Sequence, residues 1–169
     1  PTAIMVGTGK GAEHGVLIKS GEALERAHSV DTIILDKTGT LTRGRPQVTD
    51  ILPAQGVSQE ELLALAAGAE ALSEHPLGQA ILGKAREAGV AALPAEGLNA
   101  ISGRGIVAQV AGQKVAAGNS QLMREQGVDI SALQGMAGSL ADAGKTPMFF
   151  AGDGKALGLI AVADVLKDE

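Results

Sequence analysis

The sequence contains no cysteine, no tryptophan and no tyrosine, and only two phenylalanines among its 169 residues. Without cysteine, neither a disulfide framework nor a thiolate metal site can form, which is compatible with a reducing compartment. Because aromatic residues are scarce, a core must be built from alanine, leucine, isoleucine and valine. The 24 glycines indicate many tight turns.

Long hydrophobic runs are also missing. No stretch approaches the roughly 18 apolar residues that a membrane helix needs, and residues 1–11 lack the charged and apolar regions of a signal peptide. The formal net charge of -5 argues against a nucleic-acid-binding surface, and a hydrophobic content of 45% argues against disorder. The composition therefore predicts a soluble, mildly acidic chain with one or two domains.

The spacing of apolar residues predicts most of the secondary structure. Ser58 followed by Glu61 is a capping box, and Pro76 and Gly89 are typical of the first turn and the end of a helix. Alternation around two glycine-containing turns predicts β-hairpins, the second turning at Asp153 and Gly154. We expect strands at 16–19 and 32–35, hairpins at 105–119 and 148–164, and helices at 22–27, 59–73, 76–88, 120–126 and 131–143.

The order of these elements predicts an α+β fold with two parts. Residues 43–163 are expected to form an antiparallel sheet flanked by helices. This domain is inserted in an incomplete α/β, Rossmann-like domain, to which residues 1–42 and 164–169 belong. The second half of that larger domain is expected to lie outside the sequence.

The stretch DTIILDKTGTLT, residues 31–42, places Asp36 directly after an apolar, strand-like run. An aspartate at the carboxyl end of a strand lies where open α/β sheets carry their chemistry. The alternative is a polar turn without function, because Asp, Thr and Gly all favour turns. The heptapeptide DKTGTLT that begins at Asp36 favours a catalytic aspartate over a turn without function, since it resembles the phosphorylation signature of P-type ATPases.

This resemblance implies a role for each residue of the loop. Asp36 is the nucleophile that attacks the γ-phosphorus of ATP and becomes an aspartyl phosphate. Lys37, Thr38 and Thr40 offer charge or hydrogen bonds to phosphoryl oxygens, and Gly39 allows close approach of the backbone. The resemblance also implies Mg²⁺, held by Asp36 and the backbone carbonyl of Thr38 in a site that this sequence leaves incomplete.

Phosphatases of the haloacid dehalogenase type offer an alternative. They carry a second aspartate two positions after the nucleophile, which acts as general acid and base, whereas this sequence has Thr38 there. Without that base the acyl phosphate should persist, which favours a pump over a phosphatase.

The stretch SEHPLGQAI, residues 73–81, is similar to the Ser-Glu-His-Pro motif of the heavy-metal branch of P-type ATPases. The resemblance implies that His75 and Pro76 belong to a nucleotide site and that Glu70 accepts a hydrogen bond from the adenine amino group. Taken alone, His75 is equally compatible with a helix cap or a half-buried histidine, and Glu70 with a solvated helix face.

Two glycine-containing stretches extend the resemblance. The isolated pattern G-x-G at Gly103 and Gly105 is a weak signal, and a strand follows it, which excludes a Rossmann dinucleotide site. In the heavy-metal pumps the matching glycines and Ile106 form a wall against which the nucleotide lies. Gly118 and Asn119 match the Gly-Asn pair of the family, although Asn119 could simply be the N-cap of the next helix.

Together these motifs imply the ATP-binding cytoplasmic portion of a heavy-metal-transporting P-type ATPase, which couples ATP hydrolysis to ion transport through an aspartyl phosphate. Residues 1–25 look like the segment that follows the metal-binding membrane helix, so that Pro1 continues a membrane helix of the parent pump. Copper(I) is the implied ion, because GAEHGVLIKSGEALE and SEHPL look more like the copper members than the zinc and cadmium members.

The resemblance also implies the cofactors and partners. We expect ATP, ADP and Mg²⁺ as ligands, the actuator, membrane and metal-binding domains of the pump as partners, no nucleic acid, and a monomeric chain that binds ATP without turnover. A stand-alone, non-catalytic nucleotide-binding module remains the alternative from another functional class.

Overall fold

The computed structural model describes residues 2–167, apart from the side chains of Lys37 and Thr38. The chain divides into two compact units, residues 1–35 and residues 36–169. Within residues 2–167, no helix combines the length and the apolar character that a membrane span requires.

The first unit contains two helices, α1 (Thr2–Glu13) and α2 (Gly21–His28), and neither buries a residue. The helix predicted at 22–27 is confirmed, and Ser20 caps it by accepting a hydrogen bond from the backbone N–H of Ala23 at 3.2 Å. Helix α1 was not among the elements predicted from the spacing of apolar residues, and it contains three glycines, Gly7, Gly9 and Gly11, which have low helix propensity.

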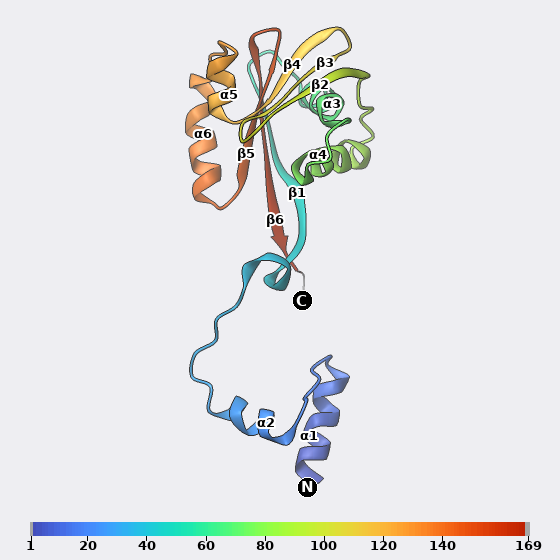
Figure 1. The fold of residues 1–169 in the computed structure, drawn as a ribbon, viewed down its shortest axis with the longest axis vertical. Coiled ribbons are helices and arrows are strands. Elements are labelled where there is room, and N and C mark those ends of the chain that lie inside the picture. The colour runs from blue at the N-terminus through green and yellow to red at the C-terminus, as the bar shows by residue number, and fades with distance from the viewer. Residues whose placement is uncertain (1, 168–169) are drawn as a thin grey trace. The chain divides into compact units, whose positions relative to one another are not determined.

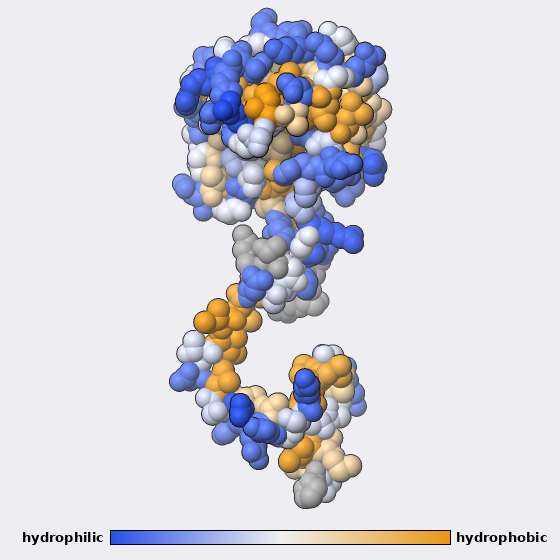
Figure 2. Space-filling model, in the orientation of Figure 1, coloured by the Kyte–Doolittle hydropathy of each residue, from blue (hydrophilic) through white to orange (hydrophobic). Residues whose placement is uncertain are grey.

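The strands predicted at 16–19 and 32–35 are wrong, since both segments are irregular in the structure. A strand is stable only when a neighbouring strand completes its hydrogen bonds, and the described residues of this unit provide none. Ile33 and Ile34 are accordingly 74% and 93% exposed, and Figure 2 shows hydrophobic surface along the segment leading into the second unit. The Rossmann-like arrangement predicted around this segment is therefore not confirmed.

The second unit is built on one 6-stranded antiparallel sheet with the strand order β1-β6-β5-β4-β3-β2 (Figure 1). The predicted antiparallel sheet with flanking helices is confirmed. Both predicted hairpins form, one from β3 and β4 and the other from β5 and β6. The strands are β1 (Thr42–Pro53), β2 (Ala95–Ile101), β3 (Gly105–Val110), β4 (Gln113–Gly118), β5 (Thr146–Gly152) and β6 (Lys155–Leu166).

Helices cover both faces of this sheet, so the unit has two hydrophobic cores (Figure 1). Because side chains alternate along a strand, Phe150 joins the core under one helix pair and Phe149 joins the core on the opposite face. The first core is covered by α3 (Gln59–Glu70) and α4 (Pro76–Glu87), the second by α5 (Ser120–Glu125) and α6 (Ser131–Asp142).

The four helices confirm the predicted segments with small differences at their ends. Ser58 caps α3 as predicted, since its Oγ accepts a hydrogen bond from the backbone N–H of Glu61 at 3.0 Å. However, α3 ends at Glu70 rather than at residue 73. The proline at position 76 disfavours helical backbone at His75, which has φ -69 and ψ 137, so the chain must leave the helix before this residue.

Strands β1 and β2 were not predicted, and they are the two edges of the sheet. An edge strand has one free side, so it tolerates proline and needs few apolar residues. This explains why β1 can contain Gly44 and Pro46, two residues that are uncommon inside a central strand. The pairing of β1 with β6 is irregular between Thr42 and Pro46, where the register shifts.

Replacing one glycine of α3 and one of α4 by alanine should change the stability of the fold in opposite directions. A Cβ at Gly68 would lie 2.6 Å from Val110 Cγ1 and 2.7 Å from the carbonyl oxygen of Leu93, whereas a Cβ at Gly83 would meet nothing within 4 Å. We expect Gly68→Ala to lower the free energy of unfolding by about 1–3 kcal/mol through overpacking. Gly83→Ala, the matched control in α4, should raise it by about 0.5–1 kcal/mol. Urea unfolding followed by circular dichroism measures both, and a stabilising Gly68→Ala would contradict the tight contact.

Candidate functional site

A cavity of about 950 Å³ opens beside the connection between α3 and α4. The opposite wall is formed by the turn between β2 and β3, the end of β4 and the start of β5. Figure 2 shows apolar residues gathered on a face of this unit and framed by hydrophilic ones. All residues that were predicted to contact a nucleotide line this one cavity: Glu70, His75, Pro76, Gly103, Gly105, Ile106, Gly118 and Asn119.

Glu70, the last residue of α3, is only 3% exposed although it lines the cavity. Burial raises the pKa of its carboxyl group, while a hydrogen bond with the Ser73 side chain and the charge of His75 lower it by less. A Cβ at Gly78 of α4 would overlap the carboxylate of Glu70, so this glycine makes room for the buried acid. The alternative of a solvated helix face is therefore wrong for Glu70, and Gly78 is a neighbour that the sequence did not indicate.

His75 is the N-cap of α4 and remains exposed on the cavity wall. Its Nδ1 accepts a hydrogen bond from the backbone N–H of Leu77 at 3.2 Å. In a neutral imidazole with an accepting Nδ1, the proton is on Nε2, so the free edge of the ring is a hydrogen-bond donor. The predicted cap and an exposed donor therefore coexist in one side chain.

The glycines of the cavity wall serve different purposes. Gly105, with φ +143, lies opposite Gly118 in the β3–β4 pair, and a Cβ on either would overlap a backbone oxygen, that of Ala117 or Arg104 respectively. Close packing between the strands explains these two glycines. Gly103 also has a positive φ of +69, but a Cβ there would meet nothing within 4 Å, so this backbone is open toward the cavity.

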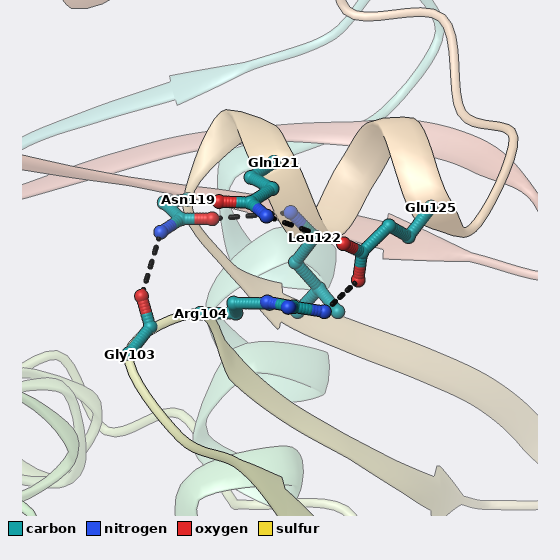
Figure 3. Close-up of polar contacts among 6 residues, drawn as sticks. All are labelled: Gly103, Arg104, Asn119, Gln121, Leu122 and Glu125. Carbon is teal, nitrogen blue, oxygen red and sulfur yellow. Dashed lines mark hydrogen bonds and ion pairs between the residues drawn. The ribbon is translucent and has the colours of Figure 1, made fainter.

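Asn119 connects the start of α5 to the glycine turn (Figure 3). Its Oδ1 accepts from the backbone N–H of Leu122 at 3.1 Å, and its Nδ2 donates to the carbonyl oxygen of Gly103 at 3.0 Å. The backbone N–H of Asn119 also donates to the carbonyl of Arg104 at 2.9 Å. The predicted N-cap is thus confirmed, and the side-chain amide links the first turn of α5 to the turn that carries Gly103.

The loop from Asp36 to Thr40 does not line the cavity. It forms a π-helical turn, η1 (Lys37–Leu41), at the start of β1. The carbonyl of Gly39 accepts from Lys167 Nζ at 3.1 Å, and its N–H donates to Thr42 Oγ1 at 3.0 Å. The buried Thr42 hydroxyl in turn donates to Asp164. Residues near the end of β6 therefore hold the loop in place.

The side chains in this loop include those of the predicted catalytic residues. Asp36 and Thr40 are exposed, whereas the side chains of Lys37 and Thr38 lie outside the described residues. Within the described part of the chain, no three His, Asp or Glu side chains come together in a way that could hold a metal ion. Asp36 and the backbone carbonyl of Thr38 stay predicted ligands of Mg²⁺.

Comparison with known proteins identifies relatives of the whole chain. A family model described as haloacid dehalogenase-like hydrolase matches residues 30–169. The chain is 45% identical over 168 residues to Copper-transporting ATPase 1 of Rhizobium meliloti and 48% identical over 167 residues to a copper-exporting P-type ATPase of Legionella pneumophila. Each alignment covers 99% of this chain but only 20% and 23% of the relative, so the chain spans about a fifth of their length.

Solved structures resemble the fold as well. A zinc-transporting PIB-type ATPase in an E2.Pi state matches with a TM-score of 0.86 and 41% identity, over 98% of this chain and 26% of that one. The isolated N-domain of a copper-transporting P-type ATPase matches with a TM-score of 0.60 and 27% identity, over 70% of this chain and 99% of that one. The catalytic domain of a CPx-ATPase, described in connection with nucleotide binding, has a TM-score of 0.63 at 27% identity.

The buried position of Glu70 predicts a pH dependence. Its folded pKa lies above its ordinary value of 4.5, so ionisation costs the folded state stability. The stability contributed by Glu70 should therefore increase as the pH falls through the raised pKa and should be lost as the pH rises. Compared with that of Glu70→Gln, the free energy of unfolding of the wild type should increase as the pH is lowered from neutral toward the ordinary value of 4.5. Urea titrations test this, with the exposed Glu96→Gln as control. A difference between wild type and Glu70→Gln that does not vary with pH would contradict it.

Proposed function

Because this chain belongs to the haloacid dehalogenase-like hydrolase family and matches one segment of copper-transporting P-type ATPases, we propose that it is the ATP-binding portion of such a pump. One observation carries the proposal: residues from α3, α4, β3 and β4, selected by their sequence motifs, surround a single cavity. Its volume of about 950 Å³ lies within the range of small-molecule sites, which run to about 1,000 Å³.

The polar groups of the cavity suit an adenine base. The Glu70 carboxylate is a buried acceptor for the amino group of adenine, and the Nε2–H of His75 is an exposed donor. Leu77, Leu98 and Ile106 add apolar surface to the lining. The open backbone at Gly103 leaves room for a sugar or a phosphate, because no side chain stands there.

The second chemical group in the proposal is Asp36. In the intact pump a carboxylate oxygen of Asp36 attacks the γ-phosphorus of ATP, the bond to the bridging oxygen breaks, and ADP leaves. The contacts of Lys167 and Thr42 with Gly39 support this role, since they fix the loop that follows the nucleophile. Bound Mg²⁺ would neutralise phosphate charge in this reaction.

We assign residues 43–163 to the nucleotide-binding domain, and residues 1–42 and 164–169 to a Rossmann-like phosphorylation domain. The remaining actuator, membrane and metal-binding domains of the pump are the proposed partners, and ATP, ADP and Mg²⁺ the ligands. The chain would be monomeric and would lie on the cytoplasmic side. Copper(I) is the proposed ion because the curated relatives are named for copper, although a zinc-transporting pump shares 41% identity.

A stand-alone binding module remains a second candidate, supported by the cavity alone. A phosphatase is disfavoured because Thr38 replaces the acid that this mechanism needs.

Titration with ATP, ADP and AMP should give dissociation constants of about 0.1–1 mM, equivalent to about 4–5.5 kcal/mol. His75→Asn should weaken binding by about 1–2 kcal/mol, because it removes the imidazole contact but keeps a side chain that caps α4. His28→Asn, in the first unit, is the matched control. Residue-resolved NMR should show the largest shifts around the cavity, and shifts clustered at residues 7–11 would refute the assignment.

The chain by itself should bind ATP without forming a stable aspartyl phosphate or turning ATP over. Among the described residues no acidic cluster accompanies Asp36, and each missing charge-stabilising group costs about 10²-fold to 10³-fold in rate. Incubation with γ-labelled ATP and Mg²⁺, followed by an acid quench, is the measurement. Label that is retained by the wild type and absent from Asp36→Asn would show that these residues suffice for phosphorylation.

A further inference from the structure

Arg104 is the one permanently cationic residue among the described residues that line the cavity. The other charged groups there, Glu70 and Glu74, are acids and would repel a polyphosphate. Arg104 lies between Gly103 and Gly105, in the turn that forms one wall. A contact between phosphate and a permanently charged side chain of this cavity would therefore involve Arg104.

In the structure the charge of Arg104 is already compensated. Its Nη1 lies 2.8 Å from Oε2 of Glu125 on α5, which does not line the cavity (Figure 3). The two side chains are 40% and 37% exposed, so this ion pair is of the partly solvated kind that contributes little to stability. Replacing Glu125 by a phosphate oxygen exchanges one charge-assisted hydrogen bond of Arg104 for another, so the net change in free energy is small.

The surroundings of the pair permit this exchange. The backbone of Arg104 is fixed, since its N–H donates to the carbonyl of Ile101 at 3.0 Å and its carbonyl accepts from Asn119 at 2.9 Å. Only the side chain has to rotate. When Arg104 leaves, the exposed Glu125 keeps water and the amide of Gln121, whose Nε2 donates to Oε1 at 3.4 Å (Figure 3). No buried charge is left without a partner.

We propose that Arg104 is the residue of this cavity that binds phosphate, and that Glu125 is its counter-ion when no ligand is bound. Competition between Glu125 and phosphate for Arg104 then determines how strongly the affinity depends on the phosphates of the ligand. This inference rests on the proposed nucleotide function of the cavity. In the resting pair most of the gain from an Arg104–phosphate contact is offset by the loss of the Arg104–Glu125 contact. Affinity in the wild type is then determined mainly by the adenosine part.

The test compares ATP with adenosine, which shares the base and sugar but has no phosphate. Calorimetric titrations of the 169-residue chain without Mg²⁺ should show that Glu125→Gln tightens ATP binding about 2–5-fold and leaves adenosine binding unchanged. The gain should shrink at high salt, because the freed charge is partly exposed. Arg104→Met should lower the ratio of ATP affinity to adenosine affinity and should abolish the effect of Glu125→Gln in the double variant.

Two controls separate a specific contact from a change in net charge. Arg124→Met removes an exposed arginine next to Glu125 that does not line the cavity, and Glu96→Gln removes an exposed acid on β2. Neither should alter the ratio. In the wild type, the Arg104 Nε–H signal in NMR spectra should shift with ATP and not with adenosine.

The outcomes are distinct. If Glu125→Gln changes ATP and adenosine binding equally, or changes neither, the role of the pair is refuted while the nucleotide site stands. If the Arg104 Nε–H signal does not respond to ATP that binds, Arg104 is not the phosphate contact. If the wild type binds neither ATP nor adenosine, the proposed function and this inference both fall.

Discussion

The shape of the cavity wall depends on the close approach of two backbones at Gly105 and Gly118. Because neither residue carries a Cβ, the pairing extends to the first residue of β3, Gly105, and the last residue of β4, Gly118, and Asn119 then follows directly as the cap of α5. This start places Asn119 beside the turn, where one amide holds Gly103 and caps the helix. The polar network of Figure 3 follows from this contact, since Gly103 pairs there with Asn119, the cap of α5, and Arg104 pairs with Glu125 of α5.

The opposite wall obeys a different constraint. There an acid is buried at the end of α3, and the structure accommodates it with a glycine at position 78 and with hydrogen bonds around Ser73. A buried carboxylate is costly unless a partner compensates it. This wall therefore presents a buried hydrogen-bond acceptor, whereas the glycine wall presents backbone without side chains.

Much of this fold could be predicted because its signals are local. Capping residues such as Ser58 and Pro76 mark helix starts within a few positions, and alternation around a turn marks a hairpin. The edge strand β1 could not be predicted in this way, because its pairing with β6 joins Thr42 to Leu166 and other residues far apart in sequence. The segment at 32–35 has the opposite problem: its composition suits a strand, but composition cannot supply a neighbour.

The candidate site, like the fold, could be predicted from the sequence only in part. Motifs identified Glu70, His75 and Gly103 in advance, and the structure brings them to one cavity, whereas their roles toward a nucleotide stay predictions. Gly78 and Glu125, which contact side chains of the cavity wall, belong to no sequence motif that would have indicated these contacts. Gly78 is eight positions from the acid that it accommodates, and Glu125 is 21 positions from Arg104, so only the folded chain reveals the contacts.

The register shift between Thr42 and Pro46 has a geometric consequence for the second unit. Beyond this shift, β1 and β6 pair from Pro46 to Pro53, with a second shift between Val48 and Asp50. Before it lies the loop of Asp36, which Lys167, just past the end of β6, contacts through the carbonyl of Gly39. A shift of this kind bends the strand and increases its twist. The direction in which the Asp36 loop leaves the sheet is therefore determined by this irregular stretch and not by the regular ladder of hydrogen bonds.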